Sequence, residues 1–271
     1  MKKLIADCGA TKTLWCILQG NSTREVCTPG FNLAHTPRET LESILTDAAE
    51  QIGPGVEEVH FFAAGLLGRV PVDLGRWFPG AAIEYASDML GAARAVCGHE
   101  KGVALILGTG ANTCSYDGKD MGWKVNSGGF IVGDEGSASV LGKLFVADYI
   151  KDCVPETMAR DFASRFQAAY PSLVKNIYRS EAPARYLGSL APFILSWYER
   201  EEYARLLVDN NFRGLFQRTL CRYDPELPVG VVGGFGYASQ DILKRLSSEY
   251  NVSFSKFLKT PMEGLVQYYA I

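Results

Sequence analysis

Two short segments that contain glycine and threonine have the composition of phosphate-binding turns. They read DCGATKT at residues 7–13 and LGTGANT at residues 107–113. Backbone N–H groups can converge on an anion there, because small residues do not block the approach. In the first segment the Thr11 and Thr13 hydroxyls and the Lys12 ammonium could add donors, and Asp7 is a candidate ligand of Mg²⁺, usually through water. An ordinary hairpin turn between two core strands would have a similar composition.

The second segment lies between two predicted strands, whereas a P-loop or a dinucleotide-binding fingerprint opens a helix. Neither GxxxxGK[ST] nor GxGxxG is satisfied at residues 107–113. These two common nucleotide motifs are therefore excluded, and a hairpin-type phosphate clamp remains. The two segments start about 100 residues apart, and each opens a similar succession of elements. This spacing indicates an internal duplication.

A third glycine-containing element reads VVGGFG at residues 231–236, where a strand runs into glycines before a helix. Such a backbone could pack flat against an adenine or a ribose. The same pattern is also typical of a turn at the start of a helix, so both interpretations stay open at this point.

Asp88 follows the last predicted strand of the first half, in the segment YASDMLGA. A carboxylate at the carboxyl end of a central strand points toward the cleft where α/β sheets bind ligands. There it could accept a proton from an attacking hydroxyl, an effect worth about 10²–10⁴ in rate. Aspartate is also a favoured helix N-cap, and Asp88 could serve both purposes.

The stretch GGFIVGDEGSA at residues 128–138 holds four glycines and two adjacent acids before a predicted helix. So many glycines are costly unless the backbone approaches something closely. Asp134 or Glu135 could form hydrogen bonds with sugar hydroxyls. Alternatively, both acids complement the dipole of the helix that follows.

The elements that must position these residues alternate between strands and helices. In the first half we expect strands at 3–8, 13–18, 23–28, 58–64 and 82–87, and helices at 36–52, 72–78 and 89–96. The first helix has a predicted capping box, with Thr36 as cap, Pro37 at its first position and Glu39 completing the T-x-x-E pattern. Its apolar side chains recur at helical spacing: Leu41, Ile44, Leu45, Ala48, Ala49 and Ile52.

The second half repeats this opening after a linker at 97–102. We expect strands at 103–107 and 112–116, and then a mostly helical region from 136 to about 223 that includes a helix at 187–208. A strand at 227–232, a helix near 239–248, a strand at 252–257 and a helix from Pro261 close the chain. Antiparallel strands followed by crossover units predict mixed sheets with helices on both faces.

The bulk properties exclude several classes of protein. The chain has 271 residues, a formal net charge of −3 and evenly spread basic residues, which disfavours nucleic acid or an anionic membrane as partner. The N-terminal segment has neither a secretory signal pattern nor a membrane span, so we expect a cytoplasmic protein. The seven cysteines form no CxxC pair, which is typical of reduced thiols and argues against a structural zinc site.

Taken together, the five segments resemble the actin-like ATPase superfamily. In their order and spacing they are similar to the N-acetylglucosamine kinase group of the BadF/BadG/BcrA/BcrD ATPase family: DCGATKT at 7–13, the Asp88 segment, LGTGANT at 107–113, GGFIVGDEGSA at 128–138 and VGGFG at 232–236. The first loop differs from the family pattern, because Cys8 and Ala10 replace two glycines. The resemblance spans most of the chain.

The resemblance implies a set of site residues and substrates. ATP would be bound by Gly9, Ala10, Thr11, Lys12, Thr13, Gly108, Thr109, Gly110, Ala111, Asn112, Gly233, Gly234 and Phe235, and Mg²⁺ by Asp7. The sugar would be contacted by Asn32, Asp88, Gly129 and Asp134, with Asp88 as the catalytic base. Relatives of this kind indicate a possible homodimer.

The resemblance also implies the fold and the activity. We expect an α/β protein with two actin-like (ribonuclease H-like) domains, each a mixed sheet flanked by helices, with a cleft between them. The first would span 1–100, completed by a helix at 259–271, and the second 101–258. The expected activity is ATP-dependent phosphorylation of an amino-sugar hydroxyl. The alternatives are an electron-transfer activator that would use Cys114 and Cys153 for an iron–sulfur cluster, and a non-catalytic sugar sensor.

Overall fold

The structure is a computed structural model that describes residues 1–9, 12–20, 22–31, 36–64, 66 and 72–270. Within these residues the chain divides into two compact units. Unit 1 comprises residues 1–100, 116–121 and 260–271, and unit 2 comprises residues 101–115 and 122–259. Both units are discontinuous in sequence, and the C-terminal segment belongs to unit 1.

In the described part of unit 1, five strands form a mixed sheet in the order β3-β2-β1-β4-β5. The strands are β1 (Lys2–Cys8), β2 (Lys12–Gln19), β3 (Ser22–Pro29), β4 (Glu58–Ala63) and β5 (Ala82–Ser87). The first three pair antiparallel, while β4 is parallel to both β1 and β5. All five predicted strands of this half are confirmed, most within one or two residues.

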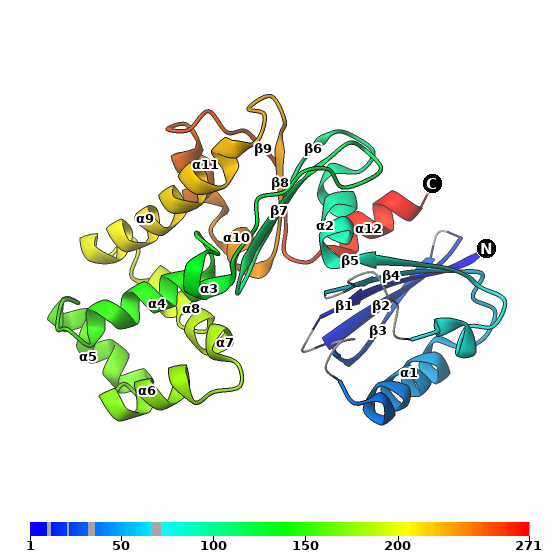
Figure 1. The fold of residues 1–271 in the computed structure, drawn as a ribbon, viewed down its shortest axis with the longest axis horizontal. Coiled ribbons are helices and arrows are strands. Elements are labelled where there is room, and N and C mark those ends of the chain that lie inside the picture. Colours follow the sequence, from blue (N-terminus) through cyan, green and yellow to red (C-terminus); the bar gives the residue numbers. More distant parts are fainter. Residues whose placement is uncertain (10–11, 21, 32–35, 65, 67–71, 271) are drawn as a thin grey trace. The chain divides into compact units, whose positions relative to one another are not determined.

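Helices cover both faces of this sheet, as Figure 1 shows for α1 (Arg38–Ile52) on one side and for α2 (Asp88–Cys97) and α12 (Met262–Tyr269) on the other. The predicted apolar side of α1 is confirmed, since Leu41, Leu45, Ala48 and Ile52 are buried. Alternate residues of β1 (Leu4, Ala6 and Cys8) join the same core. The remaining β1 residues, including Asp7, therefore point to the other face.

Two local predictions for unit 1 were wrong. Helix α1 begins at Arg38, and its N-cap is Pro37 at φ −54° and ψ 142°, so the predicted cap, Thr36, lies one residue too early. The extended ψ of Pro37 keeps this residue outside the helix. The helix predicted at 72–78 is only a single 3₁₀ turn, Leu74–Arg76, capped by the Asp73 side chain, which accepts a hydrogen bond from Gly75 N.

The sheet of unit 2 has, among the residues described, the strand order β7-β6-β8-β9. These strands are β6 (Gly102–Leu107), β7 (Ala111–Tyr116), β8 (Val229–Val232) and β9 (Phe254–Leu258). Strands β6, β8 and β9 run parallel. The three-residue link between β6 and β7 permits only an antiparallel hairpin. This sheet is therefore mixed as well, as predicted.

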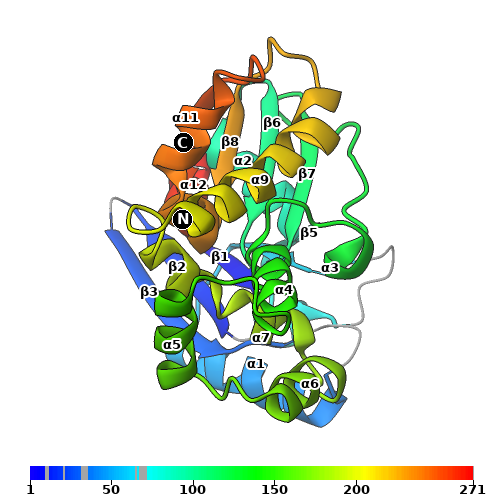
Figure 2. The same ribbon diagram turned by 90° about the vertical axis from the view of Figure 1, so that its left-hand side faces the viewer.

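The helices of unit 2 pack on this sheet and on one another. In chain order they are α3 (Gly129–Val132), α4 (Ala138–Tyr149), α5 (Glu156–Arg165), α6 (Tyr170–Tyr178), α7 (Pro183–Gly188), α8 (Ala191–Ser196), α9 (Glu202–Arg218), α10 (Gly234–Ala238) and α11 (Gln240–Ser247). Figures 1 and 2 show α5, α6 and α7 gathered away from the strands of this unit. The helix predicted at 187–208 is divided among α7, α8 and the start of α9, because Pro192 and the residues before Glu202 interrupt it.

No helix in the described parts of the chain is both long enough and apolar enough to span a membrane.

Candidate functional site

In unit 1 the carboxyl ends of three neighbouring strands lie level with one another. The register pairs Cys8 of β1 with Ala63 of β4, and Ala63 with Ser87 of β5. Asp7 is the second-last residue of β1, and Asp88 directly follows β5. The sheet therefore brings these two carboxylates to the same end of unit 1, where parallel strands of α/β proteins commonly bind ligands.

The start of α2 separates the two roles considered for Asp88. The N-cap of α2 is Ser87, whose hydroxyl oxygen accepts a hydrogen bond from Leu90 N at 3.2 Å. Asp88 is the first residue of the helix, and its Oδ1 accepts the N–H of Met89 at 2.9 Å. Ser87 thus performs the capping that the sequence left open for Asp88. Asp88 is half-buried, and its carboxylate lies at the positive end of the helix dipole, where negative side chains are commonly placed.

Asp7 has an unusual electrostatic environment. Burial, together with the negative charge of Asp88, raises the pKa of Asp7 from 3.8 to about 6, and the nearby Lys12 ammonium opposes this effect. Two carboxylates that repel each other in a partly buried site are stabilised by a cation between or beside them. The site therefore has the charge and the hard oxygen ligands that Mg²⁺ prefers.

The first predicted phosphate loop is described only in part, because Ala10 and Thr11 lie outside the described residues, as does Asn32. Cys8 is buried in the core of unit 1, where its thiol bonds the Phe31 carbonyl oxygen at 3.4 Å. The Thr13 hydroxyl is also buried and donates to Cys8 Sγ at 3.3 Å. Cys8 and the Thr13 hydroxyl thus face the interior of unit 1, and Gly9 closes the turn with a bond from its N–H to Lys12 O at 3.0 Å.

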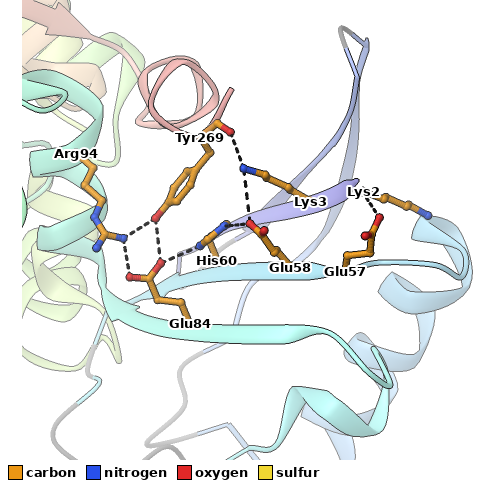
Figure 3. A network of polar contacts seen from close by, with 8 residues as sticks. All are labelled: Lys2, Lys3, Glu57, Glu58, His60, Glu84, Arg94 and Tyr269. Atoms are coloured by element: carbon orange, nitrogen blue, oxygen red, sulfur yellow. Dashed lines mark hydrogen bonds and ion pairs between the residues drawn. The ribbon is translucent and has the colours of Figure 1, made fainter. Parts of the chain in front are cut away.

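A polar network fixes α2 and α12 on the sheet of unit 1 (Figure 3). The buried Arg94 guanidinium of α2 bonds Glu84 Oε1 of β5 at 2.7 Å and the Tyr269 hydroxyl of α12 at 2.5 Å. His60 of β4 contacts Glu84 Oε2 at 2.8 Å and stacks on Tyr269 with ring centroids 3.8 Å apart. Since α2 starts at Asp88, this network helps to place the helix that carries that carboxylate.

In unit 2 the start of α4 holds the second predicted phosphate loop. The N–H groups of Ala138 and Ser139 donate to the carbonyl oxygens of Gly108 and Thr109 at 3.0 and 3.1 Å. Gly108 N also bonds Gly110 O at 3.0 Å, which closes the turn. The two residues that follow the GDEGS segment, residues 133–137, are thus bonded to this loop, although 24 residues of sequence lie between Gly108 and Gly133.

Asp134 lies against the same loop. An ideal Cβ on Gly110 would come within 2.9 Å of Asp134 Oδ2, so glycine is needed there for the carboxylate to approach. Burial raises the pKa of Asp134, and a backbone hydrogen bond from Ala111 counteracts part of that rise. Asp134 has a left-handed backbone (φ +55°), a strained conformation for a residue with a side chain. This predicted sugar ligand therefore also contacts the phosphate loop.

A cavity of about 170 Å³ opens beside the loop in unit 2. Its polar lining includes Asn112, Asn126, Ser127 and Asp134. The Arg218–Glu135 ion pair, 3.0 Å long, forms part of the wall. The amide, hydroxyl and carboxylate groups of this lining can form hydrogen bonds with the hydroxyl groups of a ligand.

In the third glycine element, the fold requires glycine at positions 233 and 236 but not at position 234. Gly233 has φ +131°, and a Cβ there would lie 2.3 Å from Leu107 O, while a Cβ on Gly236 would lie 2.7 Å from Val231 Cγ1. A Cβ on Gly234 would meet no described atom within 4 Å. The predicted ATP contact Phe235 is buried and stacks on Phe212 with ring centroids 5.6 Å apart, so only its backbone is available to a ligand.

Within each unit, some of the predicted site residues lie close together. Unit 1 brings together Asp7, Lys12 and Asp88, and unit 2 brings together Asp134 and the 108–112 loop. Gly129 is the first residue of α3, with φ +73°. In the described part of the chain no group of three or more His, Cys, Asp or Glu side chains is placed to hold a metal ion. Sequence reasoning missed Arg94 and Glu84, because an ion pair between neighbouring elements has no local motif.

These features correspond to those of known proteins. A crystal structure of a candidate N-acetylglucosamine kinase from Porphyromonas gingivalis superposes with a TM-score of 0.89 at 33% identity, covering 98% of each chain. A second candidate N-acetylglucosamine kinase, from Chromobacterium violaceum, gives 0.75 at 19% identity and also covers 98% of each chain. A ROK-family glucokinase from Streptomyces griseus, crystallised with glucose and AMPPNP, gives 0.54 at 16% identity, covering 99% of this chain and 98% of its own.

The two mixed sheets and these neighbours define an α/β protein with the actin-like fold of sugar kinases. Within that class, the chain belongs to the N-acetylglucosamine kinase-like family that includes the P. gingivalis protein. No family model matches the sequence, and no curated protein matches it either.

Proposed function

We propose that this protein is an ATP-dependent kinase that phosphorylates a hydroxyl of an amino sugar such as N-acetylglucosamine. The observation that carries the proposal is the placement of Asp7 and Asp88 at the level ends of β1 and β5, in a chain 33% identical to a candidate kinase of that kind. Two carboxylates in different environments can have different functions, one as the general base and the other as a metal ligand.

Asp88 is the proposed base. Asp88 is half-buried at the start of α2, and in its ionised form its carboxylate can accept the proton of a sugar hydroxyl as that oxygen attacks the γ-phosphate. Asp7 is the proposed holder of Mg²⁺, through water, because its carboxylate is oriented away from the α1 core and repelled by Asp88. When bound, the ion would neutralise charge on the phosphates.

Unit 2 supplies the proposed contacts to the nucleotide and part of those to the sugar. The backbone of residues 108–112 is proposed to bind phosphate, and Gly234 to lie against adenosine, since nothing described in the fold requires a glycine there. Asp134, which lines the 170 Å³ cavity, and Gly129 are proposed sugar contacts. ATP as phosphoryl donor agrees with the AMPPNP and glucose present in the S. griseus glucokinase structure.

The test is a coupled ADP-release assay with N-acetylglucosamine, glucosamine, N-acetylmannosamine, glucose and muramic-acid derivatives. We expect sugar-dependent turnover with at least one amino sugar. Asp88→Asn should lower kcat by about 10²–10⁴ while ATP affinity stays within a few-fold. Asp47→Asn, on the exposed side of α1, is the matched control and should be fully active. An Asp88→Asn variant with normal kcat would overturn the assignment of the base.

The electron-transfer alternative finds less support. Cys114 is fully buried in β7, and Cys153 is exposed after α4, so the two thiols are not both accessible for a cluster shared with a second subunit. Purified protein that contains iron and absorbs visible light would favour that alternative. Nucleotide and sugar binding with no turnover would favour a sugar sensor.

A further inference from the structure

A buried asparagine of α9 holds the GDEGS turn by its backbone. Asn211 is 4% exposed. Its Oδ1 accepts a hydrogen bond from Gly136 N at 3.2 Å, and its Nδ2 donates to Ser137 O at 3.2 Å. Both polar ends of the side chain are therefore used, and both are used on backbone atoms of two consecutive residues.

The turn that Asn211 holds is itself closely packed. Gly136 has φ +83°, and a Cβ there would lie 2.6 Å from Leu215 Cβ, one turn further along α9. Ser137, fully buried, caps α4 by accepting a hydrogen bond from Val140 N at 3.2 Å. The turn is thus constrained both by its contacts with α9 and by the cap of α4.

From this turn the positioning continues to the phosphate loop. The two residues after Ser137 donate their N–H groups to the carbonyl oxygens of Gly108 and Thr109. The residue two before Gly136 is Asp134, whose carboxylate lies against Gly110. Asn211 is therefore linked on one side to the loop and on the other side to the proposed sugar ligand.

We propose that Asn211 is a positioning residue that sets the 108–111 loop and the Asp134 carboxylate in one fixed relation. The inference rests on the proposed function, in which the loop binds phosphate and Asp134 binds sugar. A carboxamide suits this role because it accepts and donates at once, which neither a carboxylate nor an apolar side chain of similar size can do. Displacements of about 1 Å away from the reacting atoms can cost about 10²-fold in rate.

The first test replaces Asn211 with side chains of nearly the same shape. We expect Asn211→Asp and Asn211→Leu to lower kcat/KM by about 10–100-fold, mainly in kcat, because the reactants still bind but are misaligned. The neighbouring Asn210 is exposed on the same helix, so Asn210→Asp and Asn210→Leu are matched controls and should stay within about twofold of wild type.

The pH dependence of the activity of the variants distinguishes a positioning role of Asn211 from a general loss of folding. In Asn211→Asp the new carboxyl group regains a donor for Ser137 O only when protonated, and burial raises its pKa. The activity ratio of this variant to wild type should therefore rise as the pH is lowered from 8 to about 6, whereas the ratio for Asn211→Leu should stay constant. Equal, pH-independent activity of Asn211→Asp and wild type would overturn the proposal.

The second test does not depend on catalysis. Amide hydrogen exchange at Gly136, Ala138 and Ser139 should accelerate at least tenfold in Asn211→Leu and remain unchanged in Asn210→Leu. If exchange at these amides is unaltered, the positioning role of Asn211 is refuted. If wild type phosphorylates no sugar, the proposed function fails, and the exchange rates still decide whether Asn211 holds the loop. Should Asn211→Leu not fold, Asn211→Ser, which keeps a shorter donor and acceptor, is measured in its place with the same expectations.

Discussion

The carboxylates of Asp7 and Asp88 interact electrostatically at the carboxyl end of the unit 1 sheet, and the charge of Asp88 helps to hold the pKa of Asp7 near 6. The register of β1, β4 and β5 produces this proximity, although 80 residues separate the two in sequence. A carboxylate with a pKa so close to neutrality makes the stability of the fold depend on pH.

The first prediction concerns the coupling of the two carboxylates. In Asp88→Asn the repelling charge is gone, so the pKa of Asp7 should fall below 6 while burial keeps it above its ordinary value of 3.8. Carboxyl-carbon NMR titration of both proteins measures this difference. Identical Asp7 titration curves would show that the two groups do not interact.

The second prediction is that the ionised form of Asp7 destabilises the fold. Because the folded-state pKa is raised, the folded protein binds this proton more tightly than the unfolded chain, and stability is lost as the pH rises from about 4 through about 6. Asp7→Asn should therefore be more stable by about 1–2 kcal/mol at pH 7.5. Urea unfolding at pH 7.5 and at pH 4 checks this, and the gain should largely disappear at the lower pH.

The same titration should appear in activity. If Asp7 holds Mg²⁺, only its ionised form binds the ion, so kcat/KM should decline as the pH is lowered through about 6. Raising the Mg²⁺ concentration should move this decline to lower pH, because the ion competes with the proton. A decline that does not respond to Mg²⁺ would contradict the role of Asp7.

A further prediction concerns the network of Figure 3, where bonds from His60, Arg94 and Tyr269 lower the pKa of Glu84 from 4.5 to about 2. A depressed pKa contributes stability that is present above pH 4.5 and is lost as the pH falls toward 2. Glu84→Gln, which leaves buried Arg94 without its carboxylate, should destabilise by about 2–4 kcal/mol at pH 7 and by much less at pH 3. Glu57→Gln, at an exposed ion pair, is the control and should change little at either pH.

Two adjacent glycines give opposite predictions. Gly234→Ala should leave stability unchanged or raise it by about 0.5 kcal/mol, because Gly234 starts α10 and nothing described crowds it. The same change should raise the KM for ATP several-fold if adenosine lies there. Gly233→Ala should destabilise by more than about 2 kcal/mol, because its Cβ would clash with Leu107 O. Thermal unfolding and ATP kinetics of the two variants decide the matter, and a normal ATP KM in Gly234→Ala would remove Gly234 from the nucleotide site.

Periodicity and turn chemistry were sufficient to predict most of the fold. Apolar periodicity, together with the glycine and proline residues that end an element, marks the strands of both sheets and helices such as α1 and α2. The errors fall where local signals compete. Thr36, Pro37 and Glu39 form a good capping box on paper, but the extended ψ of Pro37 starts the helix one residue later. Around residues 187–208, the apolar periodicity continues past the points where the helix is interrupted, and Pro192 marks one of them.

The site was less predictable than the fold. Asp7 lies at the end of a predicted strand and Asp88 directly follows another, so their placement at one end of the sheet could be inferred from sequence. Asn211 could not, because a single asparagine in an amphipathic helix looks like any other polar residue. The contact of Asp134 with the phosphate loop also depends on a long-range turn that no motif describes. For Thr13 the motif was misleading, because it predicts a phosphate contact for the hydroxyl, whereas the hydroxyl is buried against Cys8.

The C-terminal helix α12 belongs to unit 1, where Tyr269 bonds Arg94 and Glu84, and a Cβ on Gly264 would lie only 2.1 Å from Ala95 O. During synthesis, residues 1–100 therefore leave the ribosome before α12, which is one of the two helices that cover the same face of their sheet. Unit 2, although translated later, needs no residue beyond Lys259 to be complete. A nonsense mutation near Thr260 would consequently damage the half of the protein made first and spare the half made last.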